Sequence, residues 1–485
     1  MARRRGSALV FVLVAVGAGT PPAHAVKPYD VNGDGRQDLV VGLPSWLTDD
    51  GEEVGALVAL GSKRGLIARP RVITRAALGI PGGNWEAGIG TSVASADFDG
   101  DGLADLAFGA PSLGEYEQQE YESRGAVSIA YGGRSFPGRT DLFREEKGDA
   151  PSFLGSYLVA GEVSRDGFGD LVLGPDDFDV IPGGEDGLSG EAAFMIPAPP
   201  GAERLGDVGR ALALGDTTGN GQIELFEAAQ GRDSEDGPPV AGNVAGVFDG
   251  ADRARWVAED QRGGPGSLAL ADVNGDGYGD LVTGVHHNHF RNEGKPIPGA
   301  VKIWWGGRDG LSRRPMTITQ DSPGVPGKSE AGDVFGWSVS AGRLDSDRYA
   351  DIVVGAPGED ELPGEEDAPA RGRVTIIRGG PAGYSRKRNR SFGLETRGVP
   401  GGAKRGERSF GHWTSVLDLN GDSRLDLAVS NGALAFGGGG ITIFRGTRRG
   451  LSLEDAKRVK YGRLGVGGGS GSASYARIGR PGSSG

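Results

Sequence analysis

Four short segments of the chain place acidic or amide residues at alternate positions, in the order Asp-x-Asn/Asp-x-Asp-Gly/Ser-x-x-Asp. Side-chain oxygens at positions 1, 3, 5 and 9, with the main-chain carbonyl of position 7, suit Ca²⁺, which takes about six to eight oxygen ligands. We therefore predict about four calcium sites with a structural role. The predicted ligands are Asp30, Asn32, Asp34, Arg36 and Asp38; Asp97, Asp99, Asp101, Leu103 and Asp105; Asp272, Asn274, Asp276, Tyr278 and Asp280; and Asp418, Asn420, Asp422, Arg424 and Asp426.

Two other interpretations of these loops are weaker. Asp-Gly turns without metal would leave thirteen carboxylates crowded within four loops and not neutralised. An EF-hand needs Glu at position 12 between flanking helices. Position 12 here lies within an apolar, strand-like run, so the helical calcium motif is rejected. The residues at position 12 of the four loops are Val41, Phe108, Thr283 and Val429.

Three further segments keep the spacing but lose part of the ligand set. They carry Glu162, Ser164, Asp166 and Asp170; Asp216, Thr218, Asn220 and Glu224; and Arg343, Asp345, Asp347 and Asp351. The guanidinium of Arg343, at position 1 of the last segment, could replace a cation by pairing with Asp345 or Asp347. We therefore expect that loop to be metal-free and leave metal binding by the loops at 162 and 216 open.

The acidic loops divide the chain into seven units, which begin at residues 30, 97, 162, 216, 272, 343 and 418. A run of small or alternating residues precedes most of these loops, and an apolar run follows each of them. A third run ends in Gly-Gly, and a Gly-Leu turn then leads to a fourth. Four short strands per unit predict an all-β chain, and their radial repetition predicts a seven-bladed β-propeller of four-stranded antiparallel blades. Residues 26–485 would form this single domain, with the acidic loops between first and second strands.

The first unit begins too close to residue 26 to contain its own first strand. Leu-Gly-Val-Gly-Gly-Gly at 464–469, followed by residues 472–478, resembles Leu-Gly-Ile-Pro-Gly-Gly at 78–83 and the strand expected after it. We therefore predict that the C-terminal segment supplies the missing strand and closes the ring. Deletion of residues 464–485 is expected to unfold the protein.

The repeated motifs resemble a known family. Gly-Ala-Pro at 109–111 and 355–357, Phe-Gly at 335–336 and 410–411, and the acidic loops resemble FG-GAP repeats. The resemblance covers nearly all of residues 26–485 and implies the seven-bladed propeller of integrin α subunits, to which secreted bacterial proteins are similar. It also implies that insertions between second and third strands form a ligand-binding face. It is weak for function, because one fold hosts many functions.

Composition and the N-terminal segment limit the remaining possibilities. The 485 residues carry a net charge of −13, which argues against nucleic-acid binding, and no cysteine, which excludes disulfides and thiolate chemistry. Residues 1–25 have three arginines, an apolar run and an Ala-His-Ala sequence, as a secretory signal peptide does. We expect a soluble, secreted monomer without a membrane anchor.

Candidate ligand-binding residues gather in the insertions. Acidic residues such as Glu53 and Glu359, with aromatics such as Trp46, could form solvated loops or a rim for a cationic protein or a glycan. His286, His287 and His289 could bind Zn²⁺ or Cu²⁺, although a solvated loop is the favoured interpretation. No catalytic motif is evident. We expect a binding or adhesion module for an extracellular protein or glycan; the alternatives are a secreted polysaccharide lyase or hydrolase with its active centre in the axial groove, or a lectin.

Overall fold

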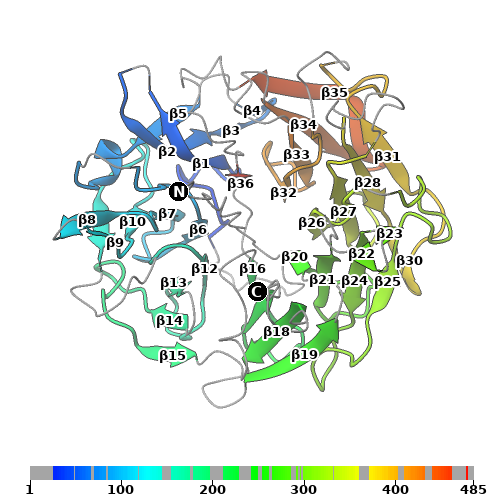
Figure 1. Ribbon diagram of the computed structural model, residues 1–485, viewed down its shortest axis with the longest axis horizontal. Coiled ribbons are helices and arrows are strands. Elements are labelled where there is room, and N and C mark those ends of the chain that lie inside the picture. The colour runs from blue at the N-terminus through cyan, green and yellow to red at the C-terminus, as the bar shows by residue number, and fades with distance from the viewer. Residues whose placement is uncertain are drawn as a thin grey trace.

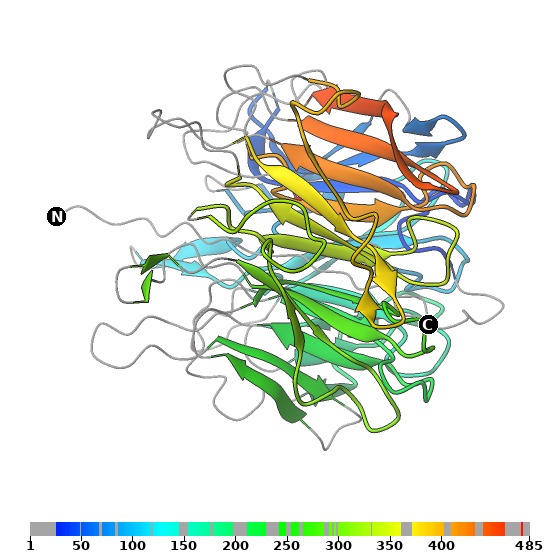
Figure 2. The ribbon, with the colours of Figure 1, turned by 90° about the vertical axis from the view of Figure 1, so that its right-hand side faces the viewer.

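Four-stranded antiparallel sheets are arranged in a ring around a common axis (Figure 1). Figure 2 shows the same ring from the side. The computed structural model describes residues 26–48, 50–66, 70–82, 86–117, 120–144, 154–174, 178–196, 211–228, 242–248, 254–260, 265–285, 291–292, 295–296, 299–330, 332–359, 371–401, 409–431, 440–460 and 477–478. The predicted signal peptide, residues 1–25, and His286, His287 and His289 lie outside these ranges. Among the described residues, no helix is long and apolar enough to cross a membrane.

Each sheet has the strand order that the sequence predicts. First strands, which precede an acidic loop, are β6 (Val93–Ala96), β12 (Leu158–Gly161), β16 (Ala211–Gly215), β20 (Pro265–Ala271), β26 (Ser338–Gly342) and β32 (Thr414–Leu417). Second strands, which follow the loop, are β1 (Leu39–Leu47), β7 (Asp105–Gly109), β13 (Asp170–Leu173), β17 (Glu224–Ala228), β21 (Asp280–Val285), β27 (Asp351–Ala356) and β33 (Asp426–Asn431).

The outer half of each sheet consists of a third and a fourth strand. Third strands are β2 (Glu53–Ala59), β10 (Val127–Ala130), β14 (Phe178–Ile181), β18 (Gly242–Phe248), β24 (Ala300–Trp304), β28 (Arg373–Ile377) and β34 (Gly440–Thr447). Fourth strands are β5 (Arg71–Thr74), β11 (Thr140–Phe143), β15 (Phe194–Ile196), β19 (Ala254–Asp260), β25 (Met316–Ile318), β31 (Arg390–Gly393) and β35 (Gly450–Lys460).

Several short elements lie outside the four-stranded sheets. A 3-10 turn, η1 (Ala76–Leu78), follows β5. Two-stranded hairpins pair β3 (Gly61–Ser62) with β4 (Gly65–Leu66), β8 (Gly114–Glu117) with β9 (Glu120–Ser123), β22 (Arg291–Asn292) with β23 (Lys295–Pro296), and β29 (Gly379–Gly380) with β30 (Gly383–Tyr384). The chain is thus all-β within the part that the structure describes.

Both ends of the chain contribute to one sheet. Six sheets use strands from one continuous stretch of chain, whereas a further four-stranded sheet has the order β36–β1–β2–β5 and so completes seven within the described residues. β36 (Arg477–Ile478) pairs antiparallel with β1, with Ile478 opposite Val41 and Arg477 opposite Gly42. This pairing agrees with the prediction that the C-terminal segment completes the first blade. The other residues of 464–485 lie outside the described part.

Apolar residues on facing sheets form the core between consecutive blades. Separate buried clusters join blades 1 and 2, 2 and 3, 3 and 4, 5 and 6, and 6 and 7, and one larger cluster includes residues from blades 4, 5, 7 and 1. The second strands are buried on both faces, which explains their continuous apolar sequence. Each blade therefore depends on its neighbours for burial.

Paired glycines permit the close approach of adjacent blades. A Cβ on a second-strand glycine would overlap the carbonyl oxygen of a glycine that leads into the first strand of the next blade, and these second glycines have positive φ. The pairs are Gly42 with Gly90, Gly109 with Gly155, Gly284 with Gly336, and Gly355 with Gly411. The Phe-Gly and Gly-Ala-Pro motifs thus meet at blade interfaces, where glycine supplies both the space and the conformation.

Candidate metal centres in the acidic loops

All seven acidic loops share one turn. The main-chain N–H of position 7 donates to the side-chain oxygen of position 5, and in this way the Asp or Asn side chain folds back on its own loop. The donors are Arg36, Leu103, Phe168, Gln222, Tyr278, Tyr349 and Arg424, and the acceptors are Asp34, Asp101, Asp166, Asn220, Asp276, Asp347 and Asp422. Loops that lost ligand residues keep this backbone.

The acidic residue at position 9 connects its loop to the third strand. In six blades it accepts an N–H from the glycine just beyond that strand or within its end, at 2.7–3.3 Å. The pairs are Asp38 with Gly61, Asp105 with Gly132, Asp170 with Gly183, Asp280 with Gly306, Asp351 with Gly379, and Asp426 with Gly446. This explains the Gly-Gly that ends several third strands in the sequence.

Burial of the position 9 carboxylates raises their pKa values. The pKa rises to about 8 for Asp105 and to about 7 for Asp38, Asp280 and Asp426, because burial disfavours the charged form more than the backbone N–H donors favour it. The neighbouring carboxylates of each loop raise these pKa values further. A cation in the loop would relieve both effects.

The second loop provides the best fit to a metal ion. Asp97, Asp99 and Asp105 can each offer one carboxylate oxygen such that the three atoms lie within 4.8 Å of one another. One oxygen of Asp97, Oδ1, is buried and has no hydrogen-bond partner. Burial raises the pKa of Asp97 and of Asp99, and the charge of Asp101 adds to the shift of both. A buried, unpartnered oxygen among hard ligands is what a calcium ion would satisfy.

The other three predicted sites differ in the cations around them. In the fifth loop, no described Lys or Arg forms an ion pair with Asp272, Asp276 or Asp280, and Asn274 Nδ2 donates to Asp276 Oδ2 at 2.8 Å. In the first loop, Arg36 Nη1 lies 2.8 Å from Asp34 Oδ2. The carboxylates of the first loop are thus partly neutralised by an arginine of the same loop, whereas those of the fifth loop have no described basic partner.

The seventh loop has the most internal neutralisation among the predicted sites. Arg424 Nη2 and Arg445 Nη2 lie 2.9 and 3.4 Å from Asp422 Oδ2, and Lys27 Nζ lies 3.4 Å from Asp418 Oδ2. The amide of Asn420 donates to both oxygens of Asp426. The ligand roles of these residues, and of the main-chain carbonyls at position 7, stay predictions.

The eroded third and fourth loops each keep an unpartnered acidic oxygen. Glu162 Oε1, at position 1 of the third loop, and Glu224 Oε1, at position 9 of the fourth, are buried without a hydrogen-bond partner. The other oxygen of Glu224 accepts from the N–H and hydroxyl of Thr217, each at 2.7 Å. Metal binding by these loops stays open.

The prediction that Arg343 replaces the cation of the sixth loop is wrong. Arg343 is exposed, and Arg378, just beyond β28, takes that role. Its Nη1 lies 3.3 Å from Asp345 Oδ2 and also binds Asp351. Burial raises the pKa of Asp351 to about 6, while the Arg378 charge opposes the shift. The sequence contained a usable signal, because Arg378 stands where Tyr131 and Trp305 precede Gly-Gly in other units.

Adjacent acidic loops bind one another around the ring. The N–H of position 8 in one loop donates to the position 1 carbonyl of the loop before it: Ala104 to Asp30, Gly169 to Asp97, Ala350 to Asp272, and Gln37 to Asp418, at 2.7–3.2 Å. The last of these pairs joins the first blade to the seventh. Gln37 Oε1 also accepts the N–H of Asp418 at 2.8 Å. Hydrogen bonds between the first and seventh acidic loops therefore close the ring together with β36.

Several residues expected at an acidic rim are structural instead. Trp46 is buried, and Glu53, which is only 5% exposed, accepts N–H groups of Ala87, Gly88 and Ile89 and pairs with Arg75 at 3.1 Å. Glu359 is also buried, and it accepts from the Gln320 amide. Neither expectation, a solvated loop or a rim that faces a ligand, holds for these three residues, because all of them are buried.

Comparison with known proteins identifies the repeat. The FG-GAP repeat family matches residues 89–129, 264–304 and 335–377, which cover the first three strands of the second, fifth and sixth blades except for the last residue of β10. The chain carries FG-GAP repeats. It is 25% identical to integrin alpha-PS2 of Drosophila melanogaster over 288 residues, or 58% of this chain and 16% of that protein.

A second group of relatives shares shorter stretches. Phosphatidylinositol-glycan-specific phospholipase D of Bos taurus is 36% identical over 160 residues, or 31% of this chain and 18% of that enzyme. Integrin alpha-5 of Xenopus laevis is 32% identical over 164 residues, or 31% of this chain and 14% of that protein. The chain thus spans less than a fifth of the length of these relatives. The similarity establishes an FG-GAP propeller that resembles integrin α, a fold that supports a binding type of module.

Proposed function

We propose that this protein is a secreted, calcium-stabilised propeller that binds an extracellular protein or glycan, as an adhesion module does. The observation that carries the proposal is the ring of FG-GAP blades, which resembles integrin α over 58% of the chain. Similar blades account for almost all of the described residues. The likeness to the phospholipase D covers 18% of that enzyme and gives no reason to assign its activity here.

Calcium would stabilise the fold and present the binding face without taking part in chemistry. Asp97, Asp99 and Asp105 would hold one ion, and the corresponding residues of the first, fifth and seventh loops would hold others. Extracellular calcium modules bind with dissociation constants of about 10⁻⁴–10⁻³ M. At roughly ten times that concentration each site adds about 1.4 kcal/mol to the free energy of unfolding. Four such sites would contribute about 6 kcal/mol, a large share of a domain's usual net stability.

The binding function is tested by presenting purified protein to arrayed glycans and extracellular matrix proteins, with calcium or with chelator. Saturable binding that is lost on calcium removal, with no turnover of the bound ligand, supports the proposal. Turnover of a polysaccharide would favour the enzyme instead. Elemental analysis of protein purified without chelator checks the metal, and finding no calcium would refute the calcium part separately.

A further inference from the structure

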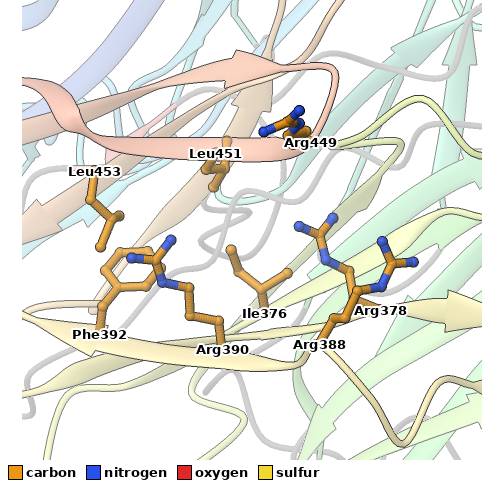
Figure 3. Close-up of a pocket in the computed structure, with 8 residues that line it drawn as sticks. All are labelled: Ile376, Arg378, Arg388, Arg390, Phe392, Arg449, Leu451 and Leu453. Carbon is orange, nitrogen blue, oxygen red and sulfur yellow. The ribbon is translucent and has the colours of Figure 1, made fainter.

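A pocket of about 190 Å³ opens between the sixth and seventh blades (Figure 3). Four arginines line it: Arg378 beyond β28, Arg388 before β31, Arg390 at the start of β31, and Arg449 before β35. Buried apolar side chains of the core between these blades, including Phe392 and Leu453, lie behind the arginines. The exposed lining of the pocket therefore consists mainly of guanidinium groups.

The positive charge of the pocket is only partly neutralised. Arg378 is buried and binds Asp345 and Asp351, so its position is fixed. Arg388 is exposed and lies 3.8 Å from Asp347. Among the described residues, no ion pair involves the side chain of Arg390 or Arg449, and both are exposed. Guanidinium groups gathered in this way favour an anion, even though the whole chain has a net charge of −13.

Comparison among blades shows why the pocket lies here. In three blades, one residue directly precedes the Gly-Gly that ends the third strand. Its side chain packs against a glycine in the turn that leads into the fourth strand of the next blade. Tyr131 packs under Gly187 and Trp305 under Gly383, whereas Arg378 packs under Gly450. Two blades thus place an aromatic ring where the sixth blade places a guanidinium. The substitution that neutralises the sixth acidic loop also gives the pocket its first fixed positive group.

We propose that this pocket binds the oxyanion group of an acidic sugar. Planar guanidinium groups match carboxylate, sulfate and phosphate with paired hydrogen bonds. Arg390 and Arg449 would bind the oxyanion from opposite blades, and Arg378 would form the fixed base; Phe392 and Leu453 are buried and would not contact the sugar ring. This inference deepens the proposed binding function, on which it rests, by naming the ligand chemistry.

Isothermal titration of the calcium-loaded protein tests the proposal. The probes are inorganic sulfate, galactose 6-sulfate, glucose 6-phosphate, glucuronate and neutral methyl glucoside. At least one charged sugar should bind more tightly than inorganic sulfate, and which one binds identifies the oxyanion. Arg390→Gln and Arg449→Gln should each weaken binding about tenfold or more, since charged hydrogen bonds are lost. Arg448→Gln is the matched control, because Arg448 is an exposed neighbour in the same turn that does not line the pocket.

Other outcomes overturn the inference. Absence of binding, equal binding of the neutral sugar, or equal weakening by Arg448→Gln would show that the pocket does not select an acidic sugar. Thermal unfolding of each variant checks that the fold is intact. If arrayed glycans or proteins bind wild type and the Arg390 and Arg449 variants equally, only this pocket assignment fails; if wild type binds none of them, the proposed function fails.

Discussion

At the scale of single residues, the same loop position can face other carboxylates or pair with an arginine of its own blade. Asp351 and Asp105 occupy position 9 of their loops and bind equivalent glycine N–H groups. Asp351 also binds Arg378, whereas Asp105 faces two other carboxylates. The sixth repeat therefore keeps the shared loop geometry while one arginine supplies positive charge to its carboxylates.

Arg378→Gln should lower the free energy of unfolding by about 3–5 kcal/mol. Removal of one partner of a buried pair leaves Asp345 and Asp351 without compensation. Arg343→Gln is the control, and it should change stability by no more than about 0.5 kcal/mol because Arg343 is exposed. Urea unfolding of the two variants measures both effects. Similar losses in both would restore Arg343 as the partner of the sixth loop.

The raised pKa values at position 9 predict a pH dependence in the calcium-free protein. The pKa of Asp105 is about 8 in the folded state against 3.8 as the ordinary value, so the folded state binds protons more tightly. The free energy of unfolding of the calcium-free protein should therefore fall as pH rises from about 4 through about 8.

Urea unfolding of calcium-free protein at several pH values measures this dependence. Asp105→Asn should make it shallower, since Asp38, Asp280 and Asp426 still contribute, whereas Asp50→Asn, which removes an exposed carboxylate, should leave it nearly unchanged. Added calcium should restore stability at pH 8. Stability that is constant or rises across this range would contradict the assignment.

At the scale of elements, the second strand is the part of each blade that tolerates least change. It is buried on both faces, and its glycine touches the backbone of the next blade. The acidic loop before it and the Gly-Gly after the third strand are joined through position 9. A change in the second strand therefore affects the acidic loop before it and the contact with the next blade as well.

Gly355→Ala should destabilise the protein by about 1–3 kcal/mol, because its Cβ would overlap the Gly411 carbonyl oxygen and backbone cannot move as a side chain can. Gly82→Ala provides the control, since a Cβ there meets nothing within 4 Å. Thermal or urea unfolding compares the two. Equal stability of both variants would show that the blades can separate slightly at no cost.

At the scale of the whole molecule, two devices close the ring. β36 pairs with two residues of β1, and Gln37 exchanges hydrogen bonds with Asp418 across the same interface. Ser62 N–H also donates to Leu419 O at 3.0 Å. Closure thus combines a strand from the far end of the chain with contacts between loops.

Deletion of residues 464–485 should lower the unfolding midpoint yet leave a folded protein at low temperature, since the loop contacts between the first and seventh blades remain. Circular dichroism during heating measures both properties. Adding Gln37→Ala to the deletion should lower the midpoint further, because it removes the side-chain oxygen that accepts the Asp418 N–H. If the deletion alone removes the cooperative transition, the sequence-based expectation of complete unfolding is correct.

The repeat itself determined most of the fold in advance. Alternating acidic residues, apolar runs and Gly-Gly turns are local patterns, so the sequence predicted the strand order, the loops and the C-terminal strand that completes the first blade. Only the tertiary structure decided which charges meet. Arg378 lies 27 positions beyond Asp351 and reaches it across the sheet, and Glu53 is buried because backbone donors more than 30 residues away surround it. Such pairings depend on how blades pack, and spacing along one chain does not encode the distance between side chains in different strands.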